Sequence, residues 1–265
     1  MRAPLSLLVF ATAMAAFLTT ASAQDWRASV SPPSPGSFPL PRPMHATYRF
    51  GWSGFTAATA DVHLATTADR LMLEGKVQTV DVVRNLWNFE ATHIATAEAS
   101  TLRPLEVKQI EHVRNKETRT TLAFDPQGVT ANRSGGKSKR MGIPNLFDLQ
   151  TALLHVRSQP LAEGTTSKLA VFPSKDPYLV TATVLRRERI TVPAGTFNAI
   201  ALDVQLSKIG KEGRLSPYRK FKKATVWLSD DPDRLFLRAE AEVFVGSVFA
   251  ELQTVEFDKT PVRHD

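Results

Sequence analysis

The sequence predicts an all-β fold with one short helix, in the form of a strongly curved antiparallel sheet or barrel-like sandwich. From His45 onward, apolar and polar residues alternate with period two, which is typical of half-buried strands. The alternating segments recur at roughly ten-residue spacing with turn residues between them, as in antiparallel sandwiches and barrels. The chain has 265 residues, 43% of them hydrophobic and 22% charged, which is ordinary globular composition.

The first 23 residues have the three-part layout of a secretory signal peptide. Arg2 supplies a positive charge, the segment from Leu5 to Leu18 is apolar or small, and Ala21 and Ala23 form an A-x-A cleavage site. The apolar segment is about 14 residues long, whereas a membrane-spanning helix needs about 20. We therefore expect Sec-type export to the periplasm, cleavage after Ala23 and no transmembrane segment in the mature chain.

Residues 24–44 are expected to form a proline-rich linker. The segment from Ser31 to Pro43 holds six of the 17 prolines, a density that precludes helix or sheet and favours an extended polyproline II spacer. A single β-rich domain is expected over residues 45–258, followed by a C-terminal tail over residues 259–265.

The period-two segments place the strands of this domain along the chain. Strands are expected at Thr47–Gly54, Asp61–Leu64, Leu71–Leu73, Leu86–Ala95, Leu105–Val113, Glu117–Phe124, Val129–Ala131, Lys168–Phe172, Tyr178–Ile190, Phe197–Ile209, Ala224–Ser229, Leu235–Val245 and Val248–Phe257. The acidic turn Asp230–Asp233, which contains a proline, is expected to join two of them as a hairpin.

One helix is expected between the two groups of strands. Asn145 is the predicted N-cap, and Leu146, Leu149, Leu153 and Val156 fall on one face of a helix about three turns long. Gln159 and Pro160 are expected to end it, and its apolar stripe is expected to pack on one end or face of the sheet.

Several motifs, taken in their order along the chain, resemble a known family. They are Tyr48-Arg49-Phe50-Gly51-Trp52, the helix segment Phe147–Leu154, Val192-Pro193-Ala194-Gly195-Thr196-Phe197-Asn198-Ala199, Val226–Asp231 and Gly246–Leu252. Together they resemble the bacterial exported family DUF3108, from about His45 to Phe257. The resemblance implies an exported β-rich domain and transfers no catalytic residue. One departure is Leu154-His155-Val156, where the family pattern has a tyrosine-rich stretch.

The common catalytic and metal-binding patterns are absent. Without cysteine the chain has no disulfide, thiolate metal site or cysteine nucleophile. Its six histidines form neither H-x-H nor H-E-x-x-H, and there is no G-x-S-x-G elbow or complete phosphate-binding loop. The acidic cluster at Asp230–Asp233 is explained by a turn without calcium. The sequence thus predicts no cofactor, no metal and no catalytic residue, and it favours a non-enzymatic role.

Two groups of residues are the candidate binding elements. An apolar interior is expected to be lined by Trp52, Phe55, Trp87, Phe89 and Trp227. Contacts to an anionic group are expected from Arg133, Lys137, Lys139, Arg140, Arg219, Lys220, Lys222 and Lys223, which lie in runs with few acids. The formal net charge of +7 agrees with an anionic partner.

The leading functional prediction is an exported basic protein that binds an apolar or amphipathic anionic component of the cell envelope, such as a lipid. One alternative is an envelope assembly or scaffolding factor without a ligand cavity. Another is a hydrolase with an unrecognised site. Nucleic acid is not expected as a partner, because no recognition module is readable. The oligomeric state is left open.

Overall fold

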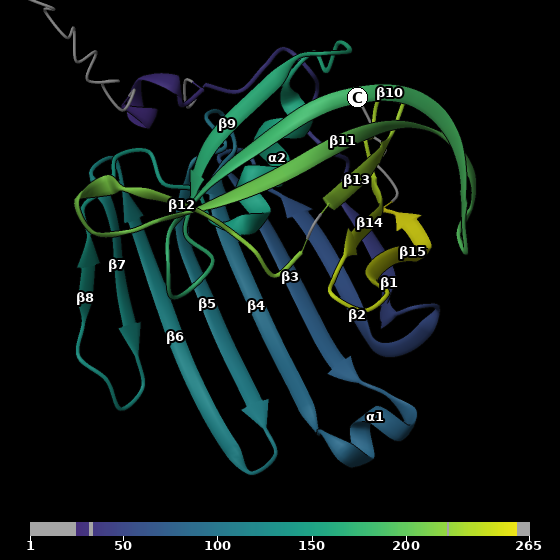
Figure 1. Ribbon diagram of the computed structural model, residues 1–265, viewed down its shortest axis with the longest axis horizontal. Helices are drawn as coiled ribbons and strands as arrows, with labels where there is room; N and C mark the ends of the chain where they lie inside the picture. Colours follow the sequence, from purple (N-terminus) through teal and green to yellow (C-terminus); the bar gives the residue numbers. More distant parts are fainter. Residues whose placement is uncertain (1–24, 32–33, 222, 259–265) are drawn as a thin grey trace, which may run out of the picture.

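The computed structural model describes residues 25–31, 34–221 and 223–258. The expected signal peptide, Lys222 and the tail over residues 259–265 lie outside the described residues. Within these ranges the chain forms one large antiparallel sheet with two α-helices, shown in Figure 1.

The sheet has fifteen strands in the order β8-β7-β6-β5-β4-β3-β2-β1-β15-β14-β13-β11-β10-β9, and β12 pairs with β11 beside this path. The strands are β1 (Met44–Trp52), β2 (Phe55–Thr66), β3 (Arg70–Thr79), β4 (Phe89–Glu98), β5 (Pro104–Val113), β6 (Lys116–Asp125), β7 (Gly128–Arg133), β8 (Lys139–Met141), β9 (Thr166–Val171), β10 (Tyr178–Val192), β11 (Gly195–Ile209), β12 (Leu215–Pro217), β13 (Lys223–Ser229), β14 (Phe236–Glu242) and β15 (Ser247–Phe257). The mostly-β class predicted from the sequence is therefore confirmed.

The predicted strong curvature and barrel-like closure need correction. The sheet is neither closed nor strongly curled, because β8 and β9 are its two edges and do not pair with each other. A period-two pattern identifies strands and their buried face, but it carries no information on whether the first and last strands meet. The first and last strands in sequence meet instead in the middle of the open sheet, where β1 pairs with β15 from Met44 opposite Phe257 to Trp52 opposite Val248.

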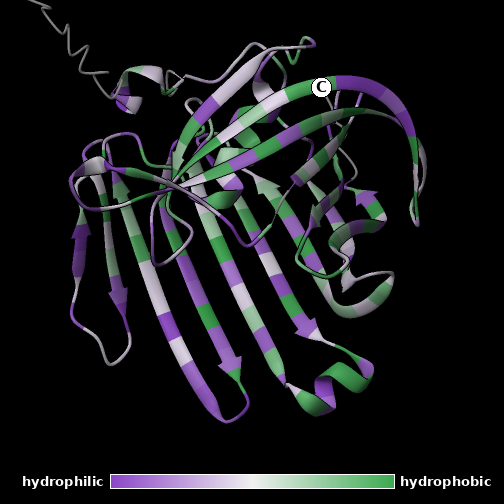
Figure 2. Ribbon diagram, in the orientation of Figure 1, coloured by the Kyte–Doolittle hydropathy of each residue, from purple (hydrophilic) through white to green (hydrophobic). Residues whose placement is uncertain are grey.

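The alternation in the sequence sets which side chains point inward. In β1 the side chains of Met44, Ala46 and Tyr48 are buried, whereas the intervening His45 is exposed and Thr47 half-buried. Successive side chains of a strand point to opposite faces of the sheet, so these residues give it one apolar face. Figure 2 shows the resulting alternation of hydrophobic and hydrophilic residues along the strands.

The helix α2 (Leu149–Ser158) begins three residues after the predicted start. Asp148 is the N-cap, and its carboxylate accepts hydrogen bonds from the backbone N–H groups of Gln150 and Thr151 at 2.8 and 3.2 Å. The predicted N-cap, Asn145, has a φ of 55° and belongs to the preceding turn. A second helix, α1 (Asp81–Leu86), lies between β3 and β4, where the sequence predicted no helix and began a strand at Leu86.

The sheet has two halves, β1–β8 and β9–β15, and they share a core. In Figure 1, β9, β10 and β11 pass above α2 and the strands of the first half. One buried cluster joins Ala95, Val107, Leu122 and Val129 of β4–β7 to Ala170, Leu179 and Ile209 of β9–β11. A second joins Ala152 and Val156 of α2 to β9, β10, β11 and β13. A smaller cluster joins Leu154 of α2 to Leu71 of β3 and Ala97 of β4, so the helix packs against strands of both halves. Val156 of the predicted apolar stripe is buried in this way, whereas Leu149 is 61% exposed.

The start of the proline-rich segment packs on the domain. Trp26 lies in the buried cluster that joins the two halves, and its indole N–H donates to the carbonyl of Gly213 at 2.8 Å. Ser31 and Lys168 of the edge strand β9 exchange two hydrogen bonds, of 2.8 and 2.9 Å. These contacts cover part of an otherwise open sheet edge.

The rest of this segment crosses the C-terminal end of α2. The backbone N–H of Gly36 donates to the Ser158 hydroxyl at 2.9 Å, and that of Phe38 donates to the Ser158 carbonyl at 3.1 Å. The Phe38 ring lies against the Arg234 guanidinium, with the Arg234 Cζ 3.3 Å from the ring centroid. Residues 25–31 and 34–43 thus form a strap docked on the domain, whereas the proline content predicted an extended spacer.

Candidate functional site

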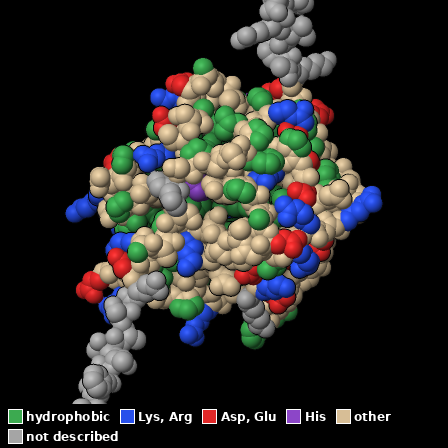
Figure 3. Space-filling view, turned by 90° about the horizontal axis from the view of Figure 1, so that it is seen from above, with side chains coloured by type: hydrophobic (Ala, Val, Ile, Leu, Met, Phe, Trp, Pro, Cys, Tyr) green, Lys and Arg blue, Asp and Glu red, His purple; other side chains and the backbone are tan. Residues whose placement is uncertain are grey.

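Two neighbouring apolar pockets border α2, and the side chain of Leu153 lines both of them. We call them the β1–β3 pocket, of about 190 Å³, and the β9–β13 pocket, of about 120 Å³. Both face the sheet surface on which α2 packs. Figure 3 shows the molecule from above, with many hydrophobic side chains toward the middle of the view and most charged side chains nearer its rim.

The β1–β3 pocket combines apolar walls with polar groups at one end. It is lined by Pro41, Met44, Tyr48, Phe50, Val62, Leu64, Leu73, Gln150, Leu153, Leu154, Arg157, Asp233, Arg234, Leu235 and Phe236. The buried Tyr48 hydroxyl donates to the carbonyl of Phe236 at 3.1 Å, and burial raises the pKa of this phenol. Because that proton already has an acceptor, Tyr48 serves as part of the apolar wall.

The β9–β13 pocket is lined by apolar side chains alone. They are Leu149, Ala152, Leu153, Val156, Leu169, Val171, Val180, Ala182, Leu202, Val204, Val226 and Leu228. Leu149, in the first turn of α2, is 61% exposed, whereas Leu169, Leu202 and Leu228 at the sheet surface are fully buried. This pocket therefore opens to solvent beside the N-terminal turn of α2, and its surface suits an aliphatic chain.

Two buried arginines stand at the C-terminal end of α2. Arg157 and Arg234 are 4% and 5% exposed. The Arg234 guanidinium donates to the carbonyls of Arg157, Gln159 and Pro160, so it caps the negative end of the helix dipole. Arg157 in turn donates to the carbonyl of Asp233. Burial and the neighbouring Arg234 charge lower the pKa of Arg157 to about 10.

The five aromatic residues predicted to line the interior lie outside these two pockets. Trp52 and Phe55 are 48% and 51% exposed on either side of the β1–β2 turn. Trp87 is also half exposed and stacks on Phe89, with ring centroids 5.3 Å apart. Trp227 is half-buried in β13 and donates to Glu188 at 2.8 Å. A strand's periodicity fixes the face of a residue but not its distance from the end of the sheet, where most of these rings lie.

The predicted cationic residues also lie away from the two pockets. Arg133, Lys137 and Lys139 are exposed around the β7–β8 turn, and Arg219, Lys220 and Lys223 are exposed between β12 and β13 or at the start of β13. Arg140 is engaged in an ion pair with Asp125 at 2.6 Å, which reduces its capacity to bind a free anion. The predicted contact Lys222 lies outside the described residues.

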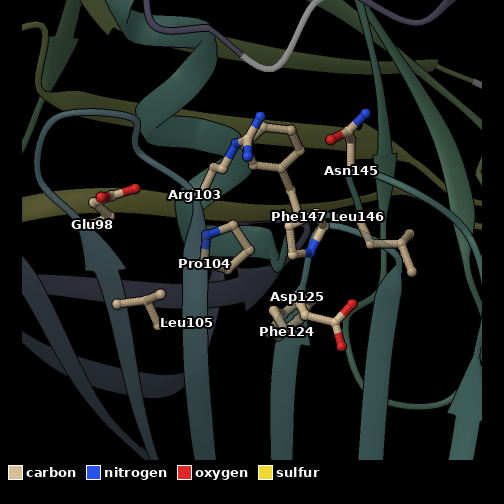
Figure 4. Close-up of a pocket in the computed structure, with 10 residues that line it drawn as sticks. Glu98, Arg103, Pro104, Leu105, Phe124, Asp125, Asn145, Leu146 and Phe147 are labelled. Atoms are coloured by element: carbon tan, nitrogen blue, oxygen red, sulfur yellow. The ribbon is translucent and has the colours of Figure 1, made fainter.

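A third pocket, shown in Figure 4, is more polar and has a volume of about 230 Å³. Its lining includes Glu98, Arg103, Asp125 and Asn145. Hydrogen bonds from Arg140 hold the pKa of Asp125 at about 2. A carboxyl that stays ionised and paired in this way is poorly suited to general acid or base catalysis.

The acidic turn predicted to be structural has that role. One carboxylate oxygen of Asp231 accepts the Ser229 hydroxyl at 2.9 Å and the backbone N–H groups of Asp233 and Arg234 at 2.9 and 3.0 Å. Within the described ranges no group of three or more His, Asp or Glu side chains could hold a metal ion. In the same part of the chain, no helix has the length and apolar character needed to cross a membrane.

Several residues of these pockets were not predicted as site residues from the sequence. Leu153 was expected to pack on the sheet, and Arg157 and Arg234 were not singled out. A usable signal for Arg157 was its position in the last turn of an amphipathic helix, where a cation four residues after Leu153 lies on the same face. Arg234 carried no comparable local signal, because its partners are about 75 residues away in sequence.

Comparisons with known proteins support the fold. No curated protein matches the sequence significantly. A solved β-barrel-like protein of the DUF1849 family from Brucella abortus is similar, with a TM-score of 0.55 and 10% identity over 84% of this chain and 100% of that chain. A DUF1089 family protein from Pseudomonas aeruginosa has a TM-score of 0.41 and 13% identity over 70% of this chain and 90% of that one. At 10% identity the likeness to the DUF1849 protein concerns the fold alone.

A third solved structure, from Bacteroides fragilis, is named a candidate exported protein with a YmcC-like fold, and it has a TM-score of 0.38 and 10% identity over 84% of this chain and 99% of that chain. The family model described as "Protein of unknown function (DUF3108)" matches residues 47–253. That match covers most of the chain and confirms the resemblance found in the sequence motifs: this chain belongs to the DUF3108 family.

Proposed function

We propose that this protein binds an apolar or amphipathic molecule of the cell envelope in the two pockets beside α2. The observation that carries the proposal is the continuity of their apolar walls through Leu153, with one end open at Leu149 and the other at the buried arginines. Their combined size is near the lower end of the roughly 300–1,000 Å³ that small-molecule sites have, which suits one aliphatic chain.

The proposed compartment is the periplasm. Its support is the signal-peptide pattern over residues 1–23, whose small-residue cleavage site precedes the docked strap directly. Fractionation of cells followed by N-terminal sequencing tests this part. A periplasmic protein that begins at Gln24 is the expected result, and a full-length cytoplasmic protein would contradict it.

A binding role that involves no chemistry on the ligand is supported by the site itself. Among the described residues, the walls of the β9–β13 pocket carry no titratable side chain, and those of the β1–β3 pocket carry Tyr48, Arg157, Asp233 and Arg234. Asp233 is engaged by Arg42 at 2.5 Å, and the Tyr48 proton is donated to a carbonyl. These groups suit binding better than nucleophilic or acid–base catalysis.

The test is native mass spectrometry of the protein purified from its own host, followed by extraction and identification of any bound molecule. We expect a discrete lipid-like mass on the wild-type protein. Leu153→Trp should reduce the occupied fraction strongly, because the larger ring fills space in both pockets.

The matched control is Met72→Trp. Met72 is 40% exposed on β3 between Leu71 and Leu73, so its side chain lies on the opposite face of the sheet from the Leu73 that lines the β1–β3 pocket. It should keep the bound molecule. A clean apoprotein mass that stays unchanged after incubation with envelope lipids, or equal loss in both variants, would count against the proposal.

A second candidate is an assembly or scaffolding role at one end of the sheet. It is favoured by exposed apolar side chains near the β14–β15 and β1–β2 turns, where Phe244 is 93%, Val245 60% and Phe55 51% exposed. Exposed apolar patches of this kind mark interaction surfaces. Phe244→Ser should then shrink the native complexes on a sizing column without removing any bound lipid. Unchanged complexes in Phe244→Ser would exclude this role for the patch.

A further inference from the structure

Arg157 and Arg234 are buried cations that have no ionic partner in the described part of the chain. The guanidinium of Arg234 donates to the carbonyl of Arg157 at 2.5 Å, so the two residues are in contact. Among the described residues, neither guanidinium has a carboxylate oxygen within the 4.0 Å that defines an ion pair. Burying a charge without a counter-charge is strongly unfavourable. An anion that entered this end of the pocket would therefore be stabilised.

The nearest carboxylates are already engaged elsewhere. Asp233 binds Arg42 through both oxygens, at 2.8 and 2.5 Å. Asp231 accepts the backbone N–H groups of Asp233 and Arg234. Both carboxylates raise the pKa of Arg157, but the larger effects of burial and of Arg234 lower it. Burial and the Arg234 charge therefore outweigh the attraction of these two carboxylates at Arg157.

Of the two arginines, Arg157 has the free donor capacity. Arg234 uses both terminal nitrogens on the carbonyls of Arg157, Gln159 and Pro160. Arg157 donates one terminal nitrogen to the carbonyl of Asp233, and its Nε is buried with no hydrogen-bond partner in the described part of the chain. A guanidinium edge of this kind matches the two oxygens of a carboxylate.

The apolar walls run away from this group along one face of α2. Leu153 lies one turn before Arg157 and Leu149 one turn before Leu153, so the three side chains follow each other on the same side. The distance from Arg157 to Leu149 along the axis is about 12 Å. An aliphatic chain that starts at Arg157 can therefore follow Leu153 toward the opening beside Leu149.

We infer that the ligand is a single-chain amphiphile with a carboxylate head, held with the head on Arg157 and the chain along Leu153 and Leu149. The inference rests on the proposed function and adds the ligand's charge, its orientation and the residue that recognises it. It also relocates anion recognition from the exposed loop lysines and arginines to one buried guanidinium. A buried donor discriminates more strongly than exposed ones, which remain hydrated.

The test measures binding of three probes with the same chain, namely dodecanoate, dodecanol and dodecyltrimethylammonium, by calorimetry below their micellar concentrations. The wild-type protein should bind dodecanoate about tenfold to a hundredfold more tightly than dodecanol, as expected for a charged hydrogen bond, and the cation weakest. Arg157→Met should bind dodecanoate and dodecanol equally. Arg157→Lys should keep part of the preference, because it retains the charge without the two-pronged geometry.

The controls separate this inference from the proposed function. Arg186→Met removes an exposed arginine that pairs with Glu188 on β10, and it should behave as wild type. Equal binding of dodecanoate and dodecanol by the wild type, or an unchanged preference in Arg157→Met, would overturn the inference while leaving the apolar pockets intact. If no probe binds, or if Leu153→Trp leaves binding unchanged, the proposed function fails instead. Retained dodecanol binding verifies that Arg157→Met is folded. If Arg157→Met does not fold, the dodecanoate preference of Arg157→Lys tests the inference instead.

Discussion

The substitution Gly36→Ala tests whether the proline-rich strap is part of the folded domain. A Cβ atom at this position would lie 2.1 Å from the carbonyl oxygen of Ser158 and 2.8 Å from the Cα of Gln159. Both are backbone atoms at the end of α2, which cannot yield as the tip of a flexible side chain would. The strap must therefore move away from the helix to accommodate a single methyl group.

The size of the effect follows from the contacts that this movement breaks. Gly36 and Phe38 each donate one backbone hydrogen bond to Ser158, and Phe38 stacks on Arg234. At about 1 kcal/mol for each hydrogen bond and about 0.5–2 kcal/mol for the cation–π contact, full detachment removes about 3 kcal/mol. If a partial shift preserves some contact, the loss is about 2 kcal/mol, which makes strap opening about thirtyfold more frequent.

Hydrogen exchange of the Phe38 amide is the direct assay, because this N–H donates to Ser158 only while the strap is docked. We expect its exchange to accelerate by about thirtyfold in Gly36→Ala, with a smaller decrease in the free energy of global unfolding. Gly75→Ala is the matched control, because a Cβ atom at Gly75 in β3 meets no atom within 4 Å. Equal exchange at Phe38 in the two variants would refute the docked strap.

Three further predictions concern stability. Trp26→Ala should lower the free energy of unfolding by up to about 3–5 kcal/mol in chemical denaturation, because the ring is buried in the cluster that joins the two halves of the sheet; an effect below about 1 kcal/mol would mean that the ring is not docked. Burial raises the pKa of Asp148 above 3.8, so the wild type should lose stability relative to Asp148→Asn as the pH rises above about 4. If the difference in the free energy of unfolding between the two proteins is the same at every pH from 3 to 7, this account is contradicted. Hydrogen bonds from Arg140 lower the pKa of Asp125 to about 2, so the advantage of the wild type over Asp125→Asn should be present above pH 3.8 and disappear as the pH falls toward 2; an advantage that persists in full at pH 2 would rule out this account.

Local periodicity accounts for most of the fold that could be predicted. The long antiparallel pair β10 and β11 was expected at Tyr178–Ile190 and Phe197–Ile209, and the observed strands differ by only two residues at the ends that face their turn. Such strands bury one face and expose the other, so their sequence records their conformation directly. The six-residue helix α1 buries no residue and therefore left no periodic signal.

The strap shows where composition alone fails. Prolines correctly favour an extended chain over helix or sheet, but they say nothing of whether that chain is free or docked. Docking here depends on Gly36, which admits the close approach to Ser158, and on Phe38, whose partner Arg234 is almost 200 residues later in the sequence. Neither contact can be predicted from the sequence, because both require that the C-terminal turn of α2 and the β13–β14 hairpin have already formed.

The same reasoning explains why the sequence directed attention to exposed cations and passed over Arg157. Runs of lysine and arginine such as those around Lys137 and Lys220 are conspicuous because they are exposed and need no partner to stay soluble. Arg157 can be recognised as a candidate only in the folded structure, because both its burial and its contact with Arg234 depend on the fold. Arg234 lies 77 residues later in the sequence and is brought to Arg157 by the β13–β14 hairpin turn. An isolated buried charge is unfavourable and persists only where the surrounding structure holds it. For this reason a single buried arginine at the end of an apolar pocket is a stronger indication of ligand recognition than a run of exposed ones.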